Sequence, residues 1–425
     1  MRKMKYSGIE WIGAIPQNWE TDRLQWHLKG INVSNKPIKT ENILSLTIEA
    51  GVIPYAEKGN QGNKAKEDYS QYKIAFPNTL VINSMNVIIG AVGISQYFGC
   101  ISPVYYVFRA ITGTDLRYIY YLFTNTGFQK EMRKYAKGIL EIRLRISSND
   151  MLKRIVPAPP FEEQQRIADY LDKMCAKIDA VLEKTRASIE EYKKLKQAVI
   201  TQAVTKGVRG DRPMKDSGIE WIGDIPAEWT ASKIKYCTEF APSCNTSHLS
   251  EDSLVTFTPM ECIKNGYFEN REAHFSALSS SYTQYQDGDI VFAKVTPCFE
   301  NGNIAIMQGL SARVGFGSSE LFVIRPQSIN TEFIFYYLQN DIFKQYACAT
   351  MTGTGGLKRV SPTFVRNYSV FIPCNEEQLE IVRYLNEKCS GIEVLIAKKQ
   401  QYLTEIENYK KSLIYEYVTG KKEVI

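Results

Sequence analysis

The chain has 425 residues, of which 44% are hydrophobic and 23% are charged. At roughly 100–200 residues per domain, this length predicts about two to four domains, and the composition excludes a disordered chain. Its 52 Lys and Arg residues outnumber 46 Asp and Glu residues, and the first 206 residues hold 30 of the former against 20 of the latter. A basic half favours a polyanionic partner such as nucleic acid.

Neither a membrane span nor a signal peptide is expected. No uncharged apolar run approaches the roughly 18–20 residues of a membrane-spanning helix, and no apolar stretch follows the basic N-terminus. We therefore expect a cytoplasmic protein with no membrane partner.

The N-terminal segment of the chain recurs in its second half. Residues 4–19 (MKYSGIEWIGAIPQNW) match residues 214–229 (MKDSGIEWIGDIPAEW) at 12 of 16 positions. We call each copy an SGIEWIG motif. Both are rich in Trp and Ile and poor in groups capable of chemistry, so we expect them to anchor the chain by apolar packing. Residues 1–19 contain the first motif, and residues 207–229 contain a linker and the second.

Residues 20–161 have the pattern of a mixed α/β domain. Thr79-Leu80-Val81-Ile82 is strand-like and Leu116–Leu122 is helix-like. Asn83, Ser84 and Asn86 follow the strand-like run and supply polar groups suited to a DNA groove.

Basic residues concentrate later in the same domain. Residues 130–154 contain eight Lys or Arg residues and three acidic ones. Cations such as Arg133, Lys134, Arg143 and Arg145 could position phosphates. A solvated helix face followed by a turn explains the same pattern equally well.

Residues 162–206 are predicted to form one long helix. Steps of four and three from Ile167 reach eleven positions, of which eight are apolar. Proline precedes the segment, and Gly207 and Gly210 follow it. Residues 376–420 repeat the pattern at an offset of 214. Rods of roughly 65 Å are expected, with each apolar stripe paired against its repeat or, alternatively, lying on a domain surface.

Residues 230–375 form the second predicted α/β domain. Asp289–Ala293 is strand-like and Phe333–Leu338 is helix-like. Lys294, Thr296 and Asn301 follow the strand-like run, and a glycine-rich loop ends at Lys358 and Arg359. Residues 230–370 hold 11 basic and 12 acidic residues, so any DNA contact there depends on local clustering.

The sequence contains no recognisable catalytic or metal-binding pattern. There is no G-x-x-x-x-G-K-[S/T] loop for nucleotide binding and no G-x-S-x-G nucleophile turn. Ala158-Pro159-Pro160-Phe161 lacks the Asp or Asn acceptor that an amino-methyltransferase loop needs. The nine cysteines and three histidines show no metal-ligand spacing. We expect no catalysis, no metal and no cofactor in this chain.

Taken together, these segments resemble the specificity subunit of a type I restriction–modification system. The resemblance covers the chain from end to end. It is carried by the twin SGIEWIG motifs, the helix starts PPFEEQQRI and PCNEEQLEI, Gly288-Asp289-Ile290-Val291-Phe292, Leu80–Asn86 and Ile101-Ser102-Pro103-Val104-Tyr105.

The resemblance implies an α+β fold. Two similar mixed α/β target-recognition domains would be separated by two long antiparallel helices in a coiled coil, with an internal pseudo-twofold. Each domain would read one half of a split, asymmetric site in double-stranded DNA, and the helices would set the spacer. Two modification subunits using S-adenosylmethionine and a restriction subunit using ATP and Mg would be the partners.

The resemblance transfers no base-reading residue, so the predicted DNA contacts rest on residue type and loop position. They are Asn83, Ser84, Asn86, Arg133, Lys134, Arg143, Arg145, Lys294, Thr296, Asn301, Lys358 and Arg359. The family's helices dock the modification subunits, which implies partner contacts at Tyr192, Leu195, Val199, Tyr402, Ile406 and Tyr409.

Two other classes of protein remain open on the residues alone. A single-chain, pseudo-dimeric DNA-binding regulator explains the repeat and the basic segments, and co-purification with a methyltransferase would separate it from a specificity subunit. A coiled-coil scaffold without nucleic acid predicts no salt-dependent DNA binding.

Overall fold

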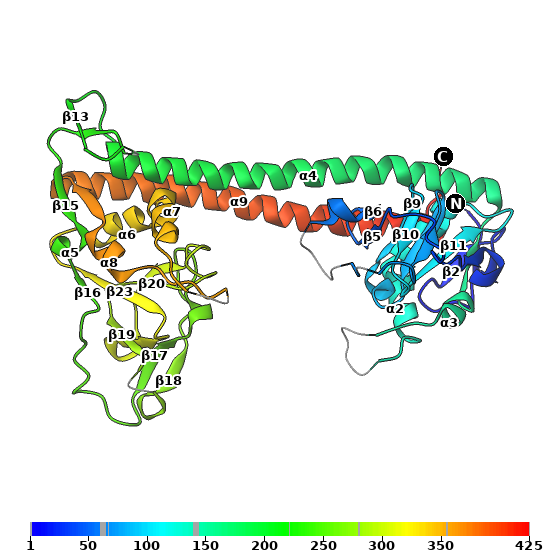
Figure 1. Cartoon of the computed structure of the whole chain (residues 1–425), viewed down its shortest axis with the longest axis horizontal. Coiled ribbons are helices and arrows are strands. Elements are labelled where there is room, and N and C mark those ends of the chain that lie inside the picture. Colours follow the sequence, from blue (N-terminus) through cyan, green and yellow to red (C-terminus); the bar gives the residue numbers. More distant parts are fainter. Residues whose placement is uncertain are drawn as a thin grey trace. The chain divides into compact units, whose positions relative to one another are not determined.

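The chain folds as two compact units (Figure 1). The structure, a computed structural model, describes residues 2–59, 65–66, 68–138, 144–220, 222–278, 281–353 and 356–424. Unit 1 comprises Met1–Arg186 and Gln401–Ile425, and unit 2 comprises Ala187–Gln400. Each unit contains one SGIEWIG motif, one mixed α/β fold and part of each of two long helices. No described helix is both long enough and apolar enough to cross a membrane.

The two long helices are α4 (Phe161–Lys206) and α9 (Asn375–Val418). Their bounds agree with the predicted segments to within two residues. Within each unit the two run antiparallel, because successive ion pairs join residues in opposite order along the chain. In unit 1 the pairs are Asp179–Lys410 at 2.6 Å and Arg186–Glu407 at 2.8 Å. In unit 2 they are Lys196–Glu393 at 2.5 Å and Arg209–Glu380 at 2.8 Å, with Arg209 three residues after the end of α4.

The buried stripe of α4 differs from the strict heptad seam. Val181 and Leu195, which the seam includes, are 39% and 48% exposed. Between residues 167 and 189, the seam positions Ile167, Leu171, Ile178 and Thr185 are buried as predicted. The other buried positions of the stripe are Cys175, Leu182 and Ile189, each one residue after a predicted seam position. Ile167 and Leu171 belong to the same apolar core as the α/β fold of unit 1, so the surface-lying alternative holds for that end of the helix.

Unit 1 is built on a four-stranded antiparallel sheet in the order β4-β11-β8-β9. Two-stranded sheets β1-β2, β3-β12, β5-β6 and β7-β10 surround it. The strands are β1 (Met4–Tyr6), β2 (Ala14–Pro16), β3 (Glu20–Arg23), β4 (Leu28–Ile31), β5 (Leu44–Thr47), β6 (Gly51–Pro54), β7 (Lys73–Ala75), β8 (Thr79–Asn83), β9 (Val92–Ser95), β10 (Gly99–Ile101), β11 (Tyr105–Ala110) and β12 (Ile155–Ala158). The helices of the α/β fold are α1 (Leu116–Thr124), α2 (Thr126–Arg133) and α3 (Ser148–Leu152).

Unit 2 repeats this order, with sheet β16-β23-β20-β21, and adds a second four-stranded sheet, β18-β17-β22-β19, in which β17 and β22 are parallel. The strands are β13 (Met214–Asp216), β14 (Asp224–Pro226), β15 (Thr230–Lys233), β16 (Thr238–Phe240), β17 (Leu254–Thr258), β18 (Glu272–His274), β19 (Thr283–Gln286), β20 (Ile290–Ala293), β21 (Ile304–Ile306), β22 (Val314–Gly317), β23 (Leu321–Pro326) and β24 (Ser369–Ile372). The helices of the α/β fold are α5 (Ile234–Cys237), α6 (Thr331–Gln339), α7 (Asp341–Ala349) and α8 (Pro362–Asn367).

The two SGIEWIG motifs pack as the sequence predicts. Each forms a short hairpin, β1-β2 or β13-β14, and buries its second tryptophan, Trp19 or Trp229. An arginine lies over each ring, with its guanidinium carbon 5.5 Å from the ring centroid for Arg2 on Trp19 and 5.6 Å for Arg212 on Trp229. The motifs therefore serve packing.

The start of each long helix is clamped to the α/β fold by a buried glutamine. In unit 1 the Gln164 side chain accepts from the Asp115 amide at 3.0 Å and donates to the Pro159 carbonyl at 2.9 Å. In unit 2 Gln378 does the same with the Asn330 amide, at 2.8 Å, and the Pro373 carbonyl. Asp115 and Asn330 in turn cap α1 and α6. The clamps orient equivalent helices in the two units.

Candidate nucleic-acid interface

In each unit, a segment distant in sequence is hydrogen-bonded to the residue that follows a central strand, β8 or β20. In unit 1 the Ile146 amide donates to the Ser84 carbonyl at 3.1 Å, and in unit 2 the Val360 amide donates to the Lys294 carbonyl at 2.9 Å. Ser84 and Lys294 directly follow their strands and differ by 210 in number. The segments that cross the strand ends are therefore equivalent, although their sequences differ.

The residue before each crossing amide is an arginine. Arg145 forms an antiparallel bridge with Lys137 through two backbone hydrogen bonds of 2.8 Å. Arg359 forms the corresponding bridge with Thr352 through hydrogen bonds of 2.8 and 3.1 Å. The structure thus places two arginines, predicted from unrelated sequence contexts, at equivalent exposed positions.

Of the three polar residues that follow Ile82, one retains an uncommitted side chain. Asn83 is buried, and its side-chain oxygen accepts from the Met85 amide at 3.0 Å. Ser84 is fully buried, and its hydroxyl has no hydrogen-bond partner among the described residues. The predicted DNA contact by the Ser84 side chain is therefore wrong, because Ser84 directly follows β8 and its side chain lies inside the fold. Asn86 is half-buried, and its backbone amide donates to the Asn83 carbonyl at 3.2 Å, but its side-chain carboxamide has no hydrogen bond to any described residue.

The basic segment 130–154 is not one helix face. Arg133 ends α2 and Lys134 follows it, and both are exposed. Lys134 pairs with Glu131 at 2.9 Å and Glu10 at 3.2 Å, and these hydrogen bonds raise the pKa of Lys134. Arg143 lies outside the described residues. The cations are spread over a helix end and a bridge.

Lys73 is a neighbouring cation that the sequence did not single out. Its ammonium donates to the Tyr105 carbonyl at 3.1 Å and lies 5.7 Å from the centroid of the Tyr106 ring. Burial and the nearby charge of Arg145 lower the pKa of Lys73. The two cations are 72 positions apart, so no local pattern reveals that they are close.

In unit 2 the predicted residues following β20 have different roles. Thr296 is buried, and its hydroxyl donates to the Gly356 carbonyl at 2.8 Å and accepts from the Lys358 amide at 3.0 Å. It therefore holds the glycine-rich loop, and its hydroxyl is not presented to a ligand. Lys358 itself is exposed. The half-buried Lys294 places its ammonium 5.7 Å from the centroid of the Phe322 ring.

Arg359 is held by a carboxylate that the sequence analysis missed. Its Nε and Nη2 atoms each lie 2.9 Å from an oxygen of Glu320. Hydrogen bonding by Arg359, with the charges of Arg359 and Lys294, lowers the pKa of Glu320 despite its partial burial. All three side chains line an open cavity of about 790 Å³, together with Thr352 and Phe364. The cavity combines net positive charge with an aromatic ring.

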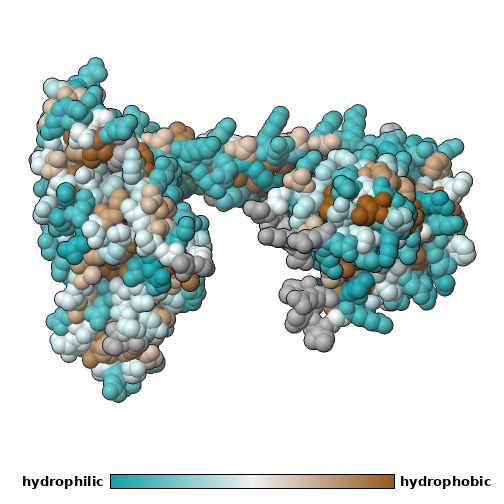
Figure 2. Space-filling view, in the orientation of Figure 1, coloured by the Kyte–Doolittle hydropathy of each residue, from teal (hydrophilic) through white to brown (hydrophobic). Residues whose placement is uncertain are grey.

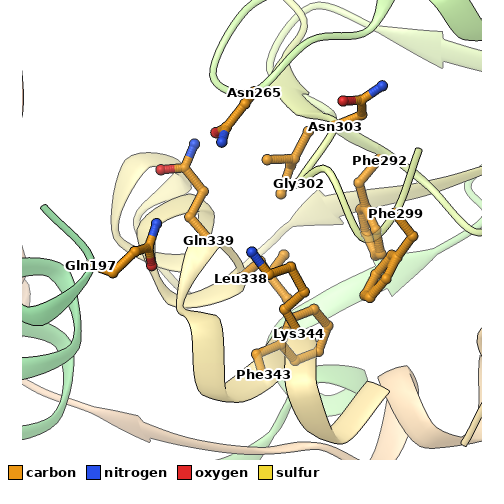
Figure 3. A pocket seen from close by; sticks show the side chains of 11 residues that line it. Gln197, Asn265, Phe292, Phe299, Gly302, Asn303, Leu338, Gln339, Phe343 and Lys344 are labelled. Atoms are coloured by element: carbon orange, nitrogen blue, oxygen red, sulfur yellow. The ribbon is translucent and has the colours of Figure 1, made fainter. Parts of the chain in front are cut away.

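Asn301 is exposed on a loop with a buried base. Figure 3 shows Phe292 and Phe299 side by side beneath this loop, with Asn265 and Gln339 facing each other near Gly302. The pocket between them has a volume of about 30 Å³, enough for a water molecule but not for a nucleobase. It is therefore too small to be a base-binding site.

The predicted partner-binding residues divide by exposure. Leu195 and Tyr402 are each 48% exposed, and Tyr409 is 53% exposed. Tyr192, Val199 and Ile406 are half-buried, and Lys399 lies over the Tyr192 ring at 5.6 Å. The visible face of the two helices is mostly hydrophilic and is interrupted by a few apolar side chains (Figure 2).

A bound metal is not suggested by any described part of the chain. No group of three or more His, Cys, Asp or Glu side chains among the described residues is arranged to hold an ion. The chemistry available at the ends of β8 and β20 is that of cations, amides and aromatic rings, which suits binding to a polyanion.

The comparisons with known proteins agree with this arrangement. A sequence model of the family described as "Type I restriction modification DNA specificity domain" matches residues 28–191 and 243–405, more than half of the chain. The chain belongs to this family. Each of its two specificity-domain matches contains the arginine at the strand end, Arg145 or Arg359, and the first part of a long helix. The first match contains all four strands of its central sheet, and the second contains β20, β21 and β23 but not β16.

Individual relatives of this specificity-domain chain differ in coverage. It is 31% identical over 189 residues to the EcoEI specificity subunit of Escherichia coli. The aligned region covers 43% of this chain and 32% of that protein. The match to the EcoAI subunit of the same organism is similar, so the chain spans about a third of the length of these relatives. It is 24% identical over 446 residues to the putative MjaX specificity subunit of Methanocaldococcus jannaschii. That alignment covers 97% of this chain and 96% of the other protein.

A solved structure, from work on complex assembly and conformational transition of the type I R-M system, shares the fold of this specificity-domain chain. The TM-score is 0.70 at 14% identity, over 96% of this chain and 99% of the other. The expected α+β class is confirmed, with two similar mixed α/β units and long helices that are antiparallel within each unit.

Proposed function

We propose that this chain is the DNA-reading subunit of a type I restriction–modification complex. Each α/β unit reads one half of a bipartite, asymmetric site in double-stranded DNA. The observation that carries the proposal is that Arg145 and Arg359 lie at equivalent positions, beside the ends of β8 and β20, in two matched specificity domains. Arginine can both position a phosphate and pair with a guanine edge.

The two half-sites differ because the equivalent positions around the arginines differ. Ser84 in unit 1 corresponds to Lys294 in unit 2. The pairings of β11 with β8 and of β23 with β20 likewise make Val104 in unit 1 the counterpart of Glu320 in unit 2. Arg145 has the cation Lys73 nearby, whereas Arg359 has the carboxylate of Glu320 and the ammonium of Lys294. These different surroundings predict different base preferences.

The long helices set the spacer and dock the partners in this proposal. The exposed apolar residues Leu195, Tyr402 and Tyr409 lie on these helices and support docking of two modification subunits. The chain itself is non-catalytic, and S-adenosylmethionine, ATP and Mg act on the modification and restriction subunits.

Mapping of adenine methylation in cells with and without this chain tests the proposal. We expect a split motif that disappears with the chain. Methylation that is unchanged without the chain contradicts the proposal, and copies of the chain that bind DNA with no methyltransferase partner support a regulator instead.

A lengthened pair of helices tests the spacer function. Duplicating residues 189–195 in α4 and 394–400 in α9 adds seven residues to each helix, or about 10 Å at 1.5 Å per residue. At 3.4 Å per base pair this predicts a spacer longer by about three base pairs, with both half-sites unchanged. An unaltered spacer would show that helix length does not set it.

A further inference from the structure

The Arg359 side chain has hydrogen-bonding capacity that the fold leaves unused. A guanidinium carries five N–H groups in a planar fork. Glu320 occupies the Nε and Nη2 side of Arg359. No described residue accepts from Nη1, and the side chain is 49% exposed. The remaining Nη1/Nη2 edge presents two parallel N–H groups, the geometry that pairs with O6 and N7 of guanine.

Arg325 in the same unit shows the contrasting, purely structural case. It binds Asp289 through the same two nitrogens at 2.7 and 2.8 Å. Its Nη1 also donates to the Ser243 carbonyl at 3.3 Å and its Nη2 approaches the Cys244 sulfur at 3.6 Å. Asp289 is buried. The donors of Arg325 are therefore directed into the protein, whereas those of Arg359 are not.

The ion pair with Glu320 is not needed to hold the backbone of Arg359. That backbone is already fixed by two hydrogen bonds to Thr352, and the next amide binds the Lys294 carbonyl. What Glu320 adds is a fixed orientation of the guanidinium, which lowers the entropy lost when the free edge binds. In unit 1 Val104 holds the position of Glu320, so Arg145 lacks this support.

We propose that Arg359, oriented by Glu320, is a base-reading residue that selects one guanine in the half-site of unit 2. This inference rests on the proposed function and deepens it, because Glu320 becomes a positioning residue for specificity. The Lys294 ammonium near the pair leaves the cluster with a net positive charge, so the carboxylate does not repel DNA.

Two conservative substitutions separate base reading from phosphate binding. Arg359→Lys keeps the charge and loses the two-pronged donor. Glu320→Gln removes the orienting carboxylate but keeps its shape. A second side-on pair in unit 2, Arg209 with Glu380 at 2.8 and 2.9 Å, lies at the start of α9 and has similar exposure. Arg209→Lys and Glu380→Gln are therefore matched controls.

The assay selects sequences from a randomised double-stranded DNA library with the full-length chain. Wild type is expected to select a split motif with one guanine in the unit 2 half-site, favoured about 5- to 150-fold over other bases. Arg359→Lys and Glu320→Gln should lose most of that preference while the other half-site remains. The controls should retain the whole motif.

The outcomes distinguish this inference from the function on which it rests. A split wild-type motif that Arg359→Lys and Glu320→Gln leave intact means that Arg359 contacts phosphate only, and overturns the inference alone. Equal loss of every motif position indicates a structural role and also overturns it. A wild type that selects no motif overturns the proposed function together with the inference.

Discussion

Replacing Arg212 by Met should destabilise unit 2 more than any loss of a surface ion pair. Arg212 lies 2.6 Å from Glu377, whose side chain is 1% exposed and also accepts from the Trp229 indole at 3.1 Å. Without Arg212 the buried carboxylate keeps, among the described cations, only the more exposed Arg209, 4.0 Å away. Removing one partner of a buried ion pair costs roughly 3–5 kcal/mol. With an m-value of about 2–3 kcal/mol per molar urea, the unfolding midpoint falls by about 1–2.5 M.

The equivalent pair in unit 1 provides the comparison. Arg2 lies 2.6 Å from Glu163, but both side chains are more exposed, at 19% and 10%. Arg2→Met should therefore cost less than Arg212→Met. Urea unfolding of the full-length chain, followed by tryptophan fluorescence, measures both. The double variant Arg212→Met with Glu377→Gln should recover part of the loss, because it removes the buried charge and keeps an acceptor for Trp229.

Unfolding of Arg212→Met at the wild-type urea concentration would contradict a stabilising buried ion pair in unit 2. A larger loss of stability in Arg2→Met than in Arg212→Met would contradict the ranking of the two pairs by depth of burial.

Three further changes have defined outcomes. Glu163→Gln should make the stability of the chain less dependent on pH in the acid range. Burial alone would raise the Glu163 pKa, but hydrogen bonding to Arg2 holds it below its usual value. The ionised carboxylate therefore stabilises the wild type above the unfolded pKa, and this stability is lost as pH falls through the folded pKa. Thermal midpoints of wild type and variant that change equally between pH 3 and 6 argue against this. Gln378→Leu should cost about 1–3 kcal/mol, because the Asn330 amide and Pro373 carbonyl lose their partner, and denaturant melts that match wild type contradict the clamp. Leu195→Glu with Tyr409→Glu should reduce co-purification of a methyltransferase while the circular dichroism spectrum stays unchanged; full recovery of the partner speaks against docking at these residues.

The repeats and the long helices could be predicted because their signals are local. An internal match and a 3.5-residue period are visible in the sequence itself, and proline and glycine mark the ends of α4. The exact stripe is harder to predict, because Cys175 and Leu182 are buried where the sequence steps select Met174 and Val181. A shift of one residue leaves the apolar periodicity almost unchanged, so the period alone cannot choose between neighbouring positions.

The candidate interface was only partly predictable because strand pairing creates it. Arg145 and Arg359 were found from their charge and loop position, but their equivalence follows from backbone hydrogen bonds across the sheet. Glu320 and Lys73 escaped notice because each is brought to its arginine by strands distant in sequence. Ser84 and Thr296 were chosen for polarity, yet the fold buries them.

The core of each unit is completed by the helix from the other half of the chain. Leu413 and Val418 of α9 are buried in the core of unit 1, and Ile200 and Val204 of α4 in that of unit 2. Dividing the chain between its two repeats would therefore remove part of the hydrophobic core from each half. An isolated half of the chain should therefore fold only when a segment equivalent to the missing helix is supplied.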